Sequence, residues 1–159
     1  MQKSKMKSQK LKVFGFTAIE ILIVVAMLAL MSAIILTGFV SYRHSQIVVK
    51  DTELVIEVLR EARSLTLQSK NSSVYGVHFE TPSVTIFTGA TYSVSATDNQ
   101  VIALNSSDTI LTPALSGGGS AVVFKRLSGE TDQDGTITIS SPNSSTVKTV
   151  TIYSTGLVE

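Results

Sequence analysis

The chain has 159 residues and no cysteine, which excludes disulfides, thiolate metal sites and cysteine nucleophiles. Thirteen Lys and Arg residues face twelve acids, and no cation lies between Lys70 and Lys125. Proteins that bind nucleic acid gather Lys and Arg along the phosphates, so we expect no nucleic-acid partner. Five of the cations are crowded into the N-terminal leader: Lys3, Lys5, Lys7, Lys10 and Lys12.

An uncharged, apolar run follows this leader over residues 21–42. A helix rises about 1.5 Å per residue, so roughly twenty residues cross a hydrocarbon core of ~30 Å. The lysines on one side predict an N-terminus that stays in the cytoplasm. The run therefore predicts a single-pass membrane protein whose remaining residues lie on the outer side of the membrane.

Glu20 decides between three interpretations of this segment. A carboxylate one turn inside a membrane helix costs a few kcal/mol, so it indicates a function. An ordinary secretory signal needs a small-x-small cleavage site after the apolar run, and residues 34–39 form a poor one. A plain membrane anchor explains the charges and the length, but it leaves Glu20 unexplained.

The third interpretation rests on the sequence Gly15-Phe16-Thr17-Ala18-Ile19-Glu20 before the apolar run. It resembles the class III signal of type IV prepilins and pseudopilins, although Ala18 stands where Leu is commoner. The resemblance implies cleavage between Gly15 and Phe16 by a prepilin peptidase, followed by N-methylation of Phe16. It also implies that Glu20 pairs with the Phe16 amine of a neighbouring subunit in a filament. Each buried charge is costly alone and tolerable when paired.

The helix is predicted to continue, without a proline, through residues 16–70. Its second half is amphipathic, with apolar residues at helical spacing: Val48, Leu54, Val55, Val58, Leu59, Ala62 and Leu65. Asp51 belongs to the polar sides of this pattern. Glu57 is placed to pair with Arg60 at i,i+3 and to repel Glu61 at i,i+4.

After Ser73 the sequence becomes typical of β-structure. Short segments rich in Val, Ile, Thr, Tyr and Phe predict strands over 74–80, 84–88, 91–95, 101–104, 122–127, 136–140 and 147–153. The glycine-rich residues 116–120 predict a loop. The expected fold is α+β: a long N-terminal helix with a membrane-spanning first half, packed against an antiparallel, β-sandwich-like head. The segments are 1–15 (cleaved leader), 16–42 (membrane and assembly half), 43–70 (amphipathic half) and 71–159 (head).

The order of the predicted elements points to one family among the pilin-like proteins. Residues 59–64, 74–77 and 151–158 are similar to the H-type minor pseudopilins of type II secretion, the GspH/FimT family. That resemblance implies a structural subunit of a type II secretion or type IV pilus-like filament, assembled through its helix. The partners it implies are other pilin or pseudopilin subunits, the prepilin peptidase, an inner-membrane assembly platform and membrane lipid. The location it implies is a bacterial inner membrane, crossed once, with the head periplasmic or extracellular.

The remaining candidate sites are weak. Asp132 and Asp134 are the only candidates for a metal, but the spacing of a calcium-binding EF-hand is absent, which favours a turn. His44 and His78 have no acid at metal-ligand spacing. We therefore predict no catalytic residue, no cofactor and no enzymatic activity. Two alternatives stay open: a filament-displayed module for DNA uptake or adhesion, and a plain single-pass anchor carrying a β domain.

Overall fold

The computed structural model describes residues 15–105 and 108–159, without the side chains of residues 34–38, 40, 41 and 70. The basic leader up to residue 14 lies outside this description. The chain forms two compact units, Met1–Gly38 and Phe39–Glu159. The helix α1 (Ala18–Leu67) begins in the first unit and ends in the second.

The first half of α1 does not agree with the predicted membrane span. Among the described residues, no helix is long and apolar enough to cross a bilayer. Glu20 places a carboxylate in the first turn of α1. A span needs about twenty consecutive apolar residues. This finding overturns the predicted membrane-spanning half-helix, and with it the predicted single-pass location in the inner membrane.

The second half of α1 packs as the apolar spacing predicts. Val48, Val55, Val58, Leu59 and Ala62 are buried in the main hydrophobic cluster, and Leu54 and Leu65 pack against it. The prediction of an amphipathic second half is confirmed. Asp51 departs from the pattern, because its side chain is fully buried rather than on a polar side. The chain leaves the helix through the short 3₁₀ turn η1 (Lys70–Ser72), in which Asn71 has a φ of 52°.

The described part of the chain contains seven strands, which form two antiparallel sheets. The first sheet has the order β3-β2-β1-β5, with β1 (Tyr75–Glu80), β2 (Ser83–Thr88), β3 (Gln100–Ala103) and β5 (Ala121–Val123). The second has the order β4-β6-β7, with β4 (Ile110–Leu115), β6 (Gly135–Ser140) and β7 (Lys148–Ile152). The α+β class with antiparallel pairing is thus present in the structure.

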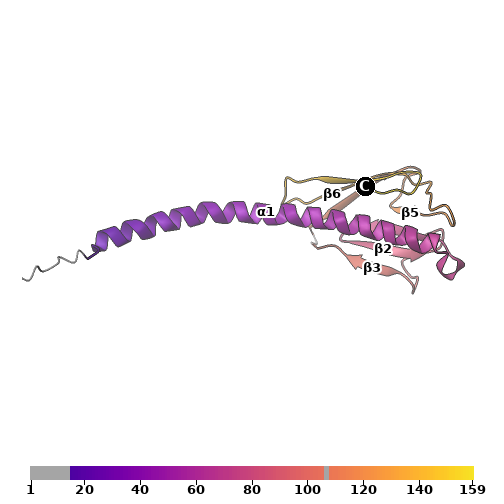
Figure 1. Cartoon of the computed structure of the whole chain (residues 1–159), viewed down its shortest axis with the longest axis horizontal. Coiled ribbons are helices and arrows are strands. Elements are labelled where there is room, and N and C mark those ends of the chain that lie inside the picture. The colour runs from indigo at the N-terminus through magenta and orange to yellow at the C-terminus, as the bar shows by residue number, and fades with distance from the viewer. Residues whose placement is uncertain (1–14, 106–107) are drawn as a thin grey trace, which may run out of the picture. The chain divides into compact units, whose positions relative to one another are not determined.

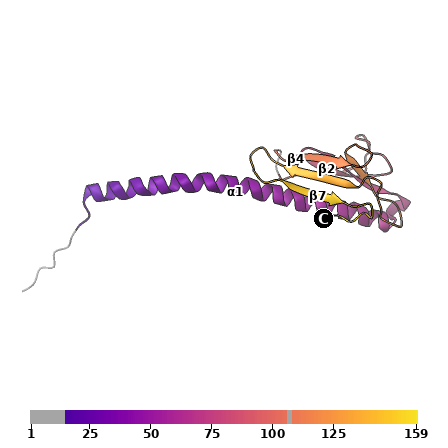
Figure 2. The same ribbon diagram turned by 90° about the horizontal axis from the view of Figure 1, so that it is seen from above.

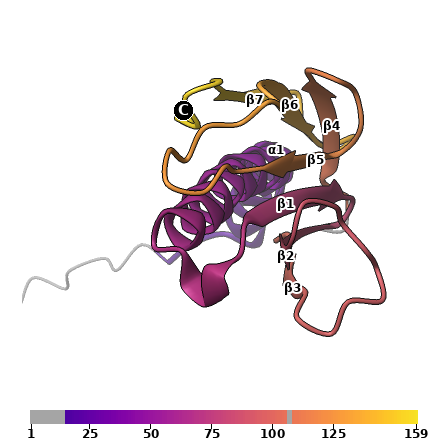
Figure 3. The same ribbon diagram turned by 90° about the vertical axis from the view of Figure 1, so that its right-hand side faces the viewer.

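The second half of α1 lies between the two sheets. Figure 1 shows β6 on one side of the helix and β2 and β3 on the other. The view along the helix in Figure 3 shows the same arrangement, and Figure 2 shows β7 running beside α1. Buried residues of the helix and of both sheets belong to one hydrophobic cluster. The predicted β-sandwich-like head is therefore corrected to two sheets that share their core with a helix.

Two strand predictions fail. Residues 91–95 form turns rather than a strand, because Tyr92 stacks on the His78 ring at 3.9 Å and Asn99 Nδ2 donates to Ser93 O at 2.8 Å. Strand β4 was not predicted, since it contains Pro113. Proline lacks the N–H that a central strand needs, and β4 tolerates it at the edge of its sheet. Five of the other predicted strands and the 116–120 loop are confirmed. The predicted strand over 122–127 is confirmed only in part, because β5 ends at Val123 and residues 126–128 form a turn.

Candidate assembly site

Gly15 and Phe16 lie in a non-helical segment immediately before α1. Apart from its chain neighbours, no described residue lies within 4 Å of a Cβ built on Gly15, and the Phe16 side chain is 79% exposed. The predicted cleavage site is therefore open to a peptidase. Because the chain itself leaves room at residue 15, any requirement for glycine there must come from the peptidase.

Glu20 takes part in the start of the helix. Thr17 Oγ1 accepts a hydrogen bond from Glu20 N at 3.3 Å, and Glu20 Oε2 accepts one from Thr17 N at 3.5 Å. This reciprocal arrangement is a capping box, which satisfies amide groups that have no partner at a helix N-terminus. Sequence reasoning missed the role of Thr17, although the Thr-x-x-Glu spacing before an apolar run is a known signal for it.

The first half of α1 exposes apolar side chains all around its circumference. Five consecutive residues from Ile21 to Val25 are exposed to about half or more, and a helix places five successive residues on every side. The large exposed residues also include Ile19, Met27, Leu28, Leu30 and Met31. Such a surface marks an interaction site, because a helix that is hydrophobic on all sides is normally buried.

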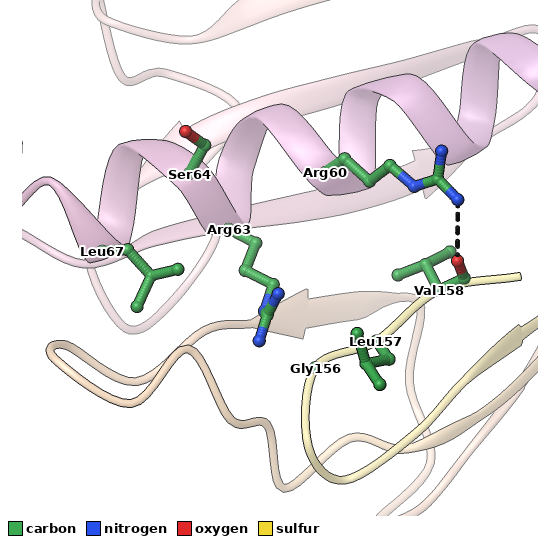
Figure 4. A pocket seen from close by; sticks show the side chains of 7 residues that line it. All are labelled: Arg60, Arg63, Ser64, Leu67, Gly156, Leu157 and Val158. Atoms are coloured by element: carbon green, nitrogen blue, oxygen red, sulfur yellow. Dashed lines mark hydrogen bonds between the residues drawn. The ribbon is translucent and has the colours of Figure 1, made fainter.

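A hollow of about 260 Å³ lies at the end of α1 in the second unit. Its walls come from the helix and from the C-terminal segment, and Figure 4 shows Arg60 and Arg63 reaching from the helix toward that segment. We call this site the arginine hollow. It is lined by Arg60, Arg63, Ser64, Leu67, Gly156, Leu157 and Val158.

Among the described residues, both arginines of the hollow donate hydrogen bonds to backbone carbonyls alone. Arg60 donates to Val158 O at 3.1 Å. Arg63 donates to Gly129 O at 3.1 Å and to Thr155 O at 3.2 Å. The predicted Glu57–Arg60 pair is wrong, since the described ion pairs do not include it. These bonds hold the C-terminal segment and the 125–131 turn against the helix.

Gly156 is required at the foot of the hollow. Its φ is +75°, and a Cβ there would lie 1.8 Å from Gly129 O and 2.9 Å from Arg63 Nε. A residue with a side chain would clash with a backbone oxygen that cannot give way. The position therefore keeps the C-terminal segment close enough for Arg63 to bridge it.

Asp132 and Asp134 are not brought together with further ligands. Asp132 pairs with Lys125 Nζ at 2.6 Å, and this hydrogen bond raises the pKa of Lys125. Within the part of the chain that the structure describes, no group of three or more His, Cys, Asp or Glu residues could hold a metal ion. Residues 132–134 connect to β6 as a bend and irregular backbone, and Asp132 is occupied by its contact with Lys125.

His78 lies on β1, stacked against Tyr92 with an interplanar angle of 9°. Burial lowers the pKa of His78, and the Glu80 carboxylate at 4.0 Å from Nε2 acts in the opposite direction. The buried Nδ1 atom has no hydrogen-bond partner among the described residues. The ring therefore packs as a neutral aromatic side chain, and His44 belongs to a different element, α1.

Comparisons with known proteins give no relative: no family, no curated protein and no solved structure matches this chain.

Proposed function

We propose that this chain is a structural subunit, of the minor pilin or pseudopilin kind, in a type IV pilus-like or type II secretion filament. It is cut between Gly15 and Phe16 by a prepilin peptidase, and the new amine of Phe16 is methylated. The first half of α1 then packs against the helices of other subunits. The role is structural, and the partners are other subunits of the filament, the peptidase and the assembly platform.

The observation that carries this proposal is the apolar, exposed first half of α1 in one helix with a folded β-rich unit. Exposed apolar residues from Ile19 to Met31 cover every side of the helix. The second half of the same helix is committed to the core of the second unit. A helix that buries one half within its own subunit and leaves the other half uncovered is suited to bundling with identical or related helices.

Glu20 has two possible contributions, and two matched variants separate them. Glu20→Gln keeps the capping box, because Gln serves at this position as Glu does, but it removes the charge. Thr17→Ala removes half of the capping box and keeps the charge. A filament subunit needs the charge to pair with the Phe16 amine of a neighbour, whereas a helix start needs only the cap.

The test is the recovery of the full chain in filaments sheared from cells, measured by immunoblot against total protein. Loss of one partner of a buried ion pair costs about 3–5 kcal/mol, which is roughly two to three powers of ten in association. We therefore expect Glu20→Gln to abolish recovery and Thr17→Ala to leave most of it. The intact mass of recovered chains is expected to match a start at methylated Phe16.

Equal recovery of the wild type and Glu20→Gln would contradict the filament role. A loss confined to Thr17→Ala would assign Glu20 to helix capping alone. A mature N-terminus beyond the apolar run would instead indicate an ordinary secretory signal.

A further inference from the structure

The exposed side of the second half of α1 carries two like-charged pairs. Glu57 and Glu61 stand four residues apart and are both exposed, and we call them the acidic edge. Arg60, exposed, and Arg63, half-buried, stand three residues apart and line the arginine hollow. With 3.6 residues per turn, the midpoints of the two pairs lie about 110° apart around the helix axis. The acidic pair and the arginine pair therefore lie at the two edges of one exposed surface of the helix.

Neither pair is neutralised within the described subunit. All twelve acids of the chain belong to the described residues, and none of them forms an ion pair with Arg60 or Arg63. The described cations likewise form no ion pair with Glu57 or Glu61. Like charges one turn apart destabilise a helix slightly, so each pair carries a small unrelieved repulsion.

The arginine hollow has the chemistry of a carboxylate site. The bonds to Val158, Gly129 and Thr155 leave most of the N–H donors of the two guanidinium groups for a ligand. Guanidinium groups bind carboxylates in a planar, often bidentate fashion. Leu67 and Leu157 are 40% and 58% exposed and flank the charges with apolar surface. The aliphatic part of a glutamate side chain can pack against these leucines.

We propose that the arginine hollow binds the carboxylates of Glu57 and Glu61 from a second copy of this chain. This inference rests on the filament-subunit function proposed above. Donor and acceptor lie on different edges of the helix, so a head-to-tail contact uses one edge of each copy and leaves the other edge free for the next copy. Contacts of this heterologous kind generate open filaments when the rotation does not close a ring. The paired charges also fix which neighbour and which register are accepted.

The experiment uses the absence of native cysteine in the full-length chain. One copy carries Leu157→Cys in the wall of the hollow. A second, co-expressed copy carries Gln68→Cys. Gln68 is exposed and lies one turn beyond Ser64, on the same side of the helix as the acidic edge. A short bismaleimide then links the copies, and the yield of mixed dimer is read on a gel. Either cysteine chain expressed alone is expected to give little dimer, because the contact is head to tail.

Charge reversal tests the contact. Glu57→Arg with Glu61→Arg in the Gln68→Cys copy is expected to lower the dimer yield about tenfold, because it sets like charges face to face. Arg60→Glu in the Leu157→Cys copy is expected to do the same. Arg63 is kept, since it makes two bonds to the fold, to Gly129 and Thr155, whereas Arg60 makes one, to Val158. Combining the two altered copies restores opposite charges, and we expect at least half of the original yield to return.

The control is Glu80→Arg with Asp98→Arg, which makes the same charge change at two exposed acids away from α1 and is expected to leave the yield unchanged. Yields that stay level after charge reversal, or that fall without returning in the combined pair, overturn the proposed contact. Filament recovery is measured in the same cells. If filaments form normally but the crosslink does not, only the proposed contact is refuted. If the wild-type chain forms no filaments, the proposed filament function is refuted as well.

Discussion

Asp51 is a buried carboxylate that ties α1 to the loop after β3. Its side chain is fully buried, and Oδ1 accepts hydrogen bonds from Asn105 N and Asn105 Nδ2, both at 2.7 Å. Oδ2 accepts one from Thr109 Oγ1 at 2.5 Å. A buried charge persists only when such donors satisfy it. The three bonds therefore explain why an acid occupies a position in the core of the helix packing.

Removal of this carboxylate is expected to destabilise the second unit. Asp51→Ala leaves the donors of Asn105 and Thr109 without their acceptor, at a cost of about 2–3 kcal/mol. Asp51→Asn is expected to cost less, because its amide oxygen still accepts from Asn105 and its NH₂ can donate to the Thr109 hydroxyl. The free energy of unfolding from urea titration measures both. Glu53→Ala, an exposed acid two residues away, is the control, and an equally small effect of Asp51→Ala would refute the network.

Asp51 also marks a limit of sequence reasoning at this scale. The apolar spacing of Val48, Val55 and Ala62 correctly predicts the buried stripe. It cannot show that a charged residue lies within the same stripe. The donors that satisfy the Asp51 carboxylate are Asn105 and Thr109, which lie more than fifty positions further along the chain. The Thr17–Glu20 cap is different, since its signal is local and could have been recognised.

At the scale of elements, α1 is the part of the molecule on which both sheets depend. Leu59 is fully buried in the cluster that also contains Val77 of β1 and Ile137 of β6. Strand prediction succeeds where the apolar alternation reports one buried face, as in β6. It misses β4, an edge strand that contains Pro113. It is wrong at residues 91–95, where Tyr92 stacks on the His78 ring and the backbone forms no strand.

Leu59→Asp is expected to destabilise the second unit strongly. The variant buries an unpaired charge against two sheets, which places it among the large single-residue effects of about 4 kcal/mol or more. The melting temperature, followed by circular dichroism, is expected to fall steeply or the transition to disappear. Gln46→Asp introduces the same charge at an exposed position of α1 and is expected to change little. Unchanged melting of Leu59→Asp would mean that the helix does not complete the core.

At the scale of the whole molecule, the chain separates two tasks. The unit Phe39–Glu159 contains every residue of the main hydrophobic cluster, from Val48 to Val158. The unit Met1–Gly38 contributes none of them among its described residues, and its described apolar side chains are exposed. The sequence predicted the amphipathic half of the helix and the β-rich segment, because both are recorded in local periodicity. It could not predict that both sheets pack on the buried side of the helix, because that arrangement depends on contacts between distant segments.

This division predicts which truncations fold. A chain that begins at Phe39 keeps the whole cluster, so we expect cooperative thermal unfolding at the same melting temperature as the second unit of the full chain.

A chain that begins at Asn71 lacks Val48, Val55, Val58, Leu59 and Ala62. Each buried aliphatic side chain of this size contributes about 1.5–3 kcal/mol, and a folded domain has only about 5–15 kcal/mol in total. The shorter chain is therefore expected to lack a cooperative transition and to show rapid amide exchange throughout both sheets. Adding the peptide of residues 43–70 in trans is expected to restore part of the protection. Cooperative unfolding of the Asn71 chain by itself would show that the sheets form a core of their own, and that α1 only covers it.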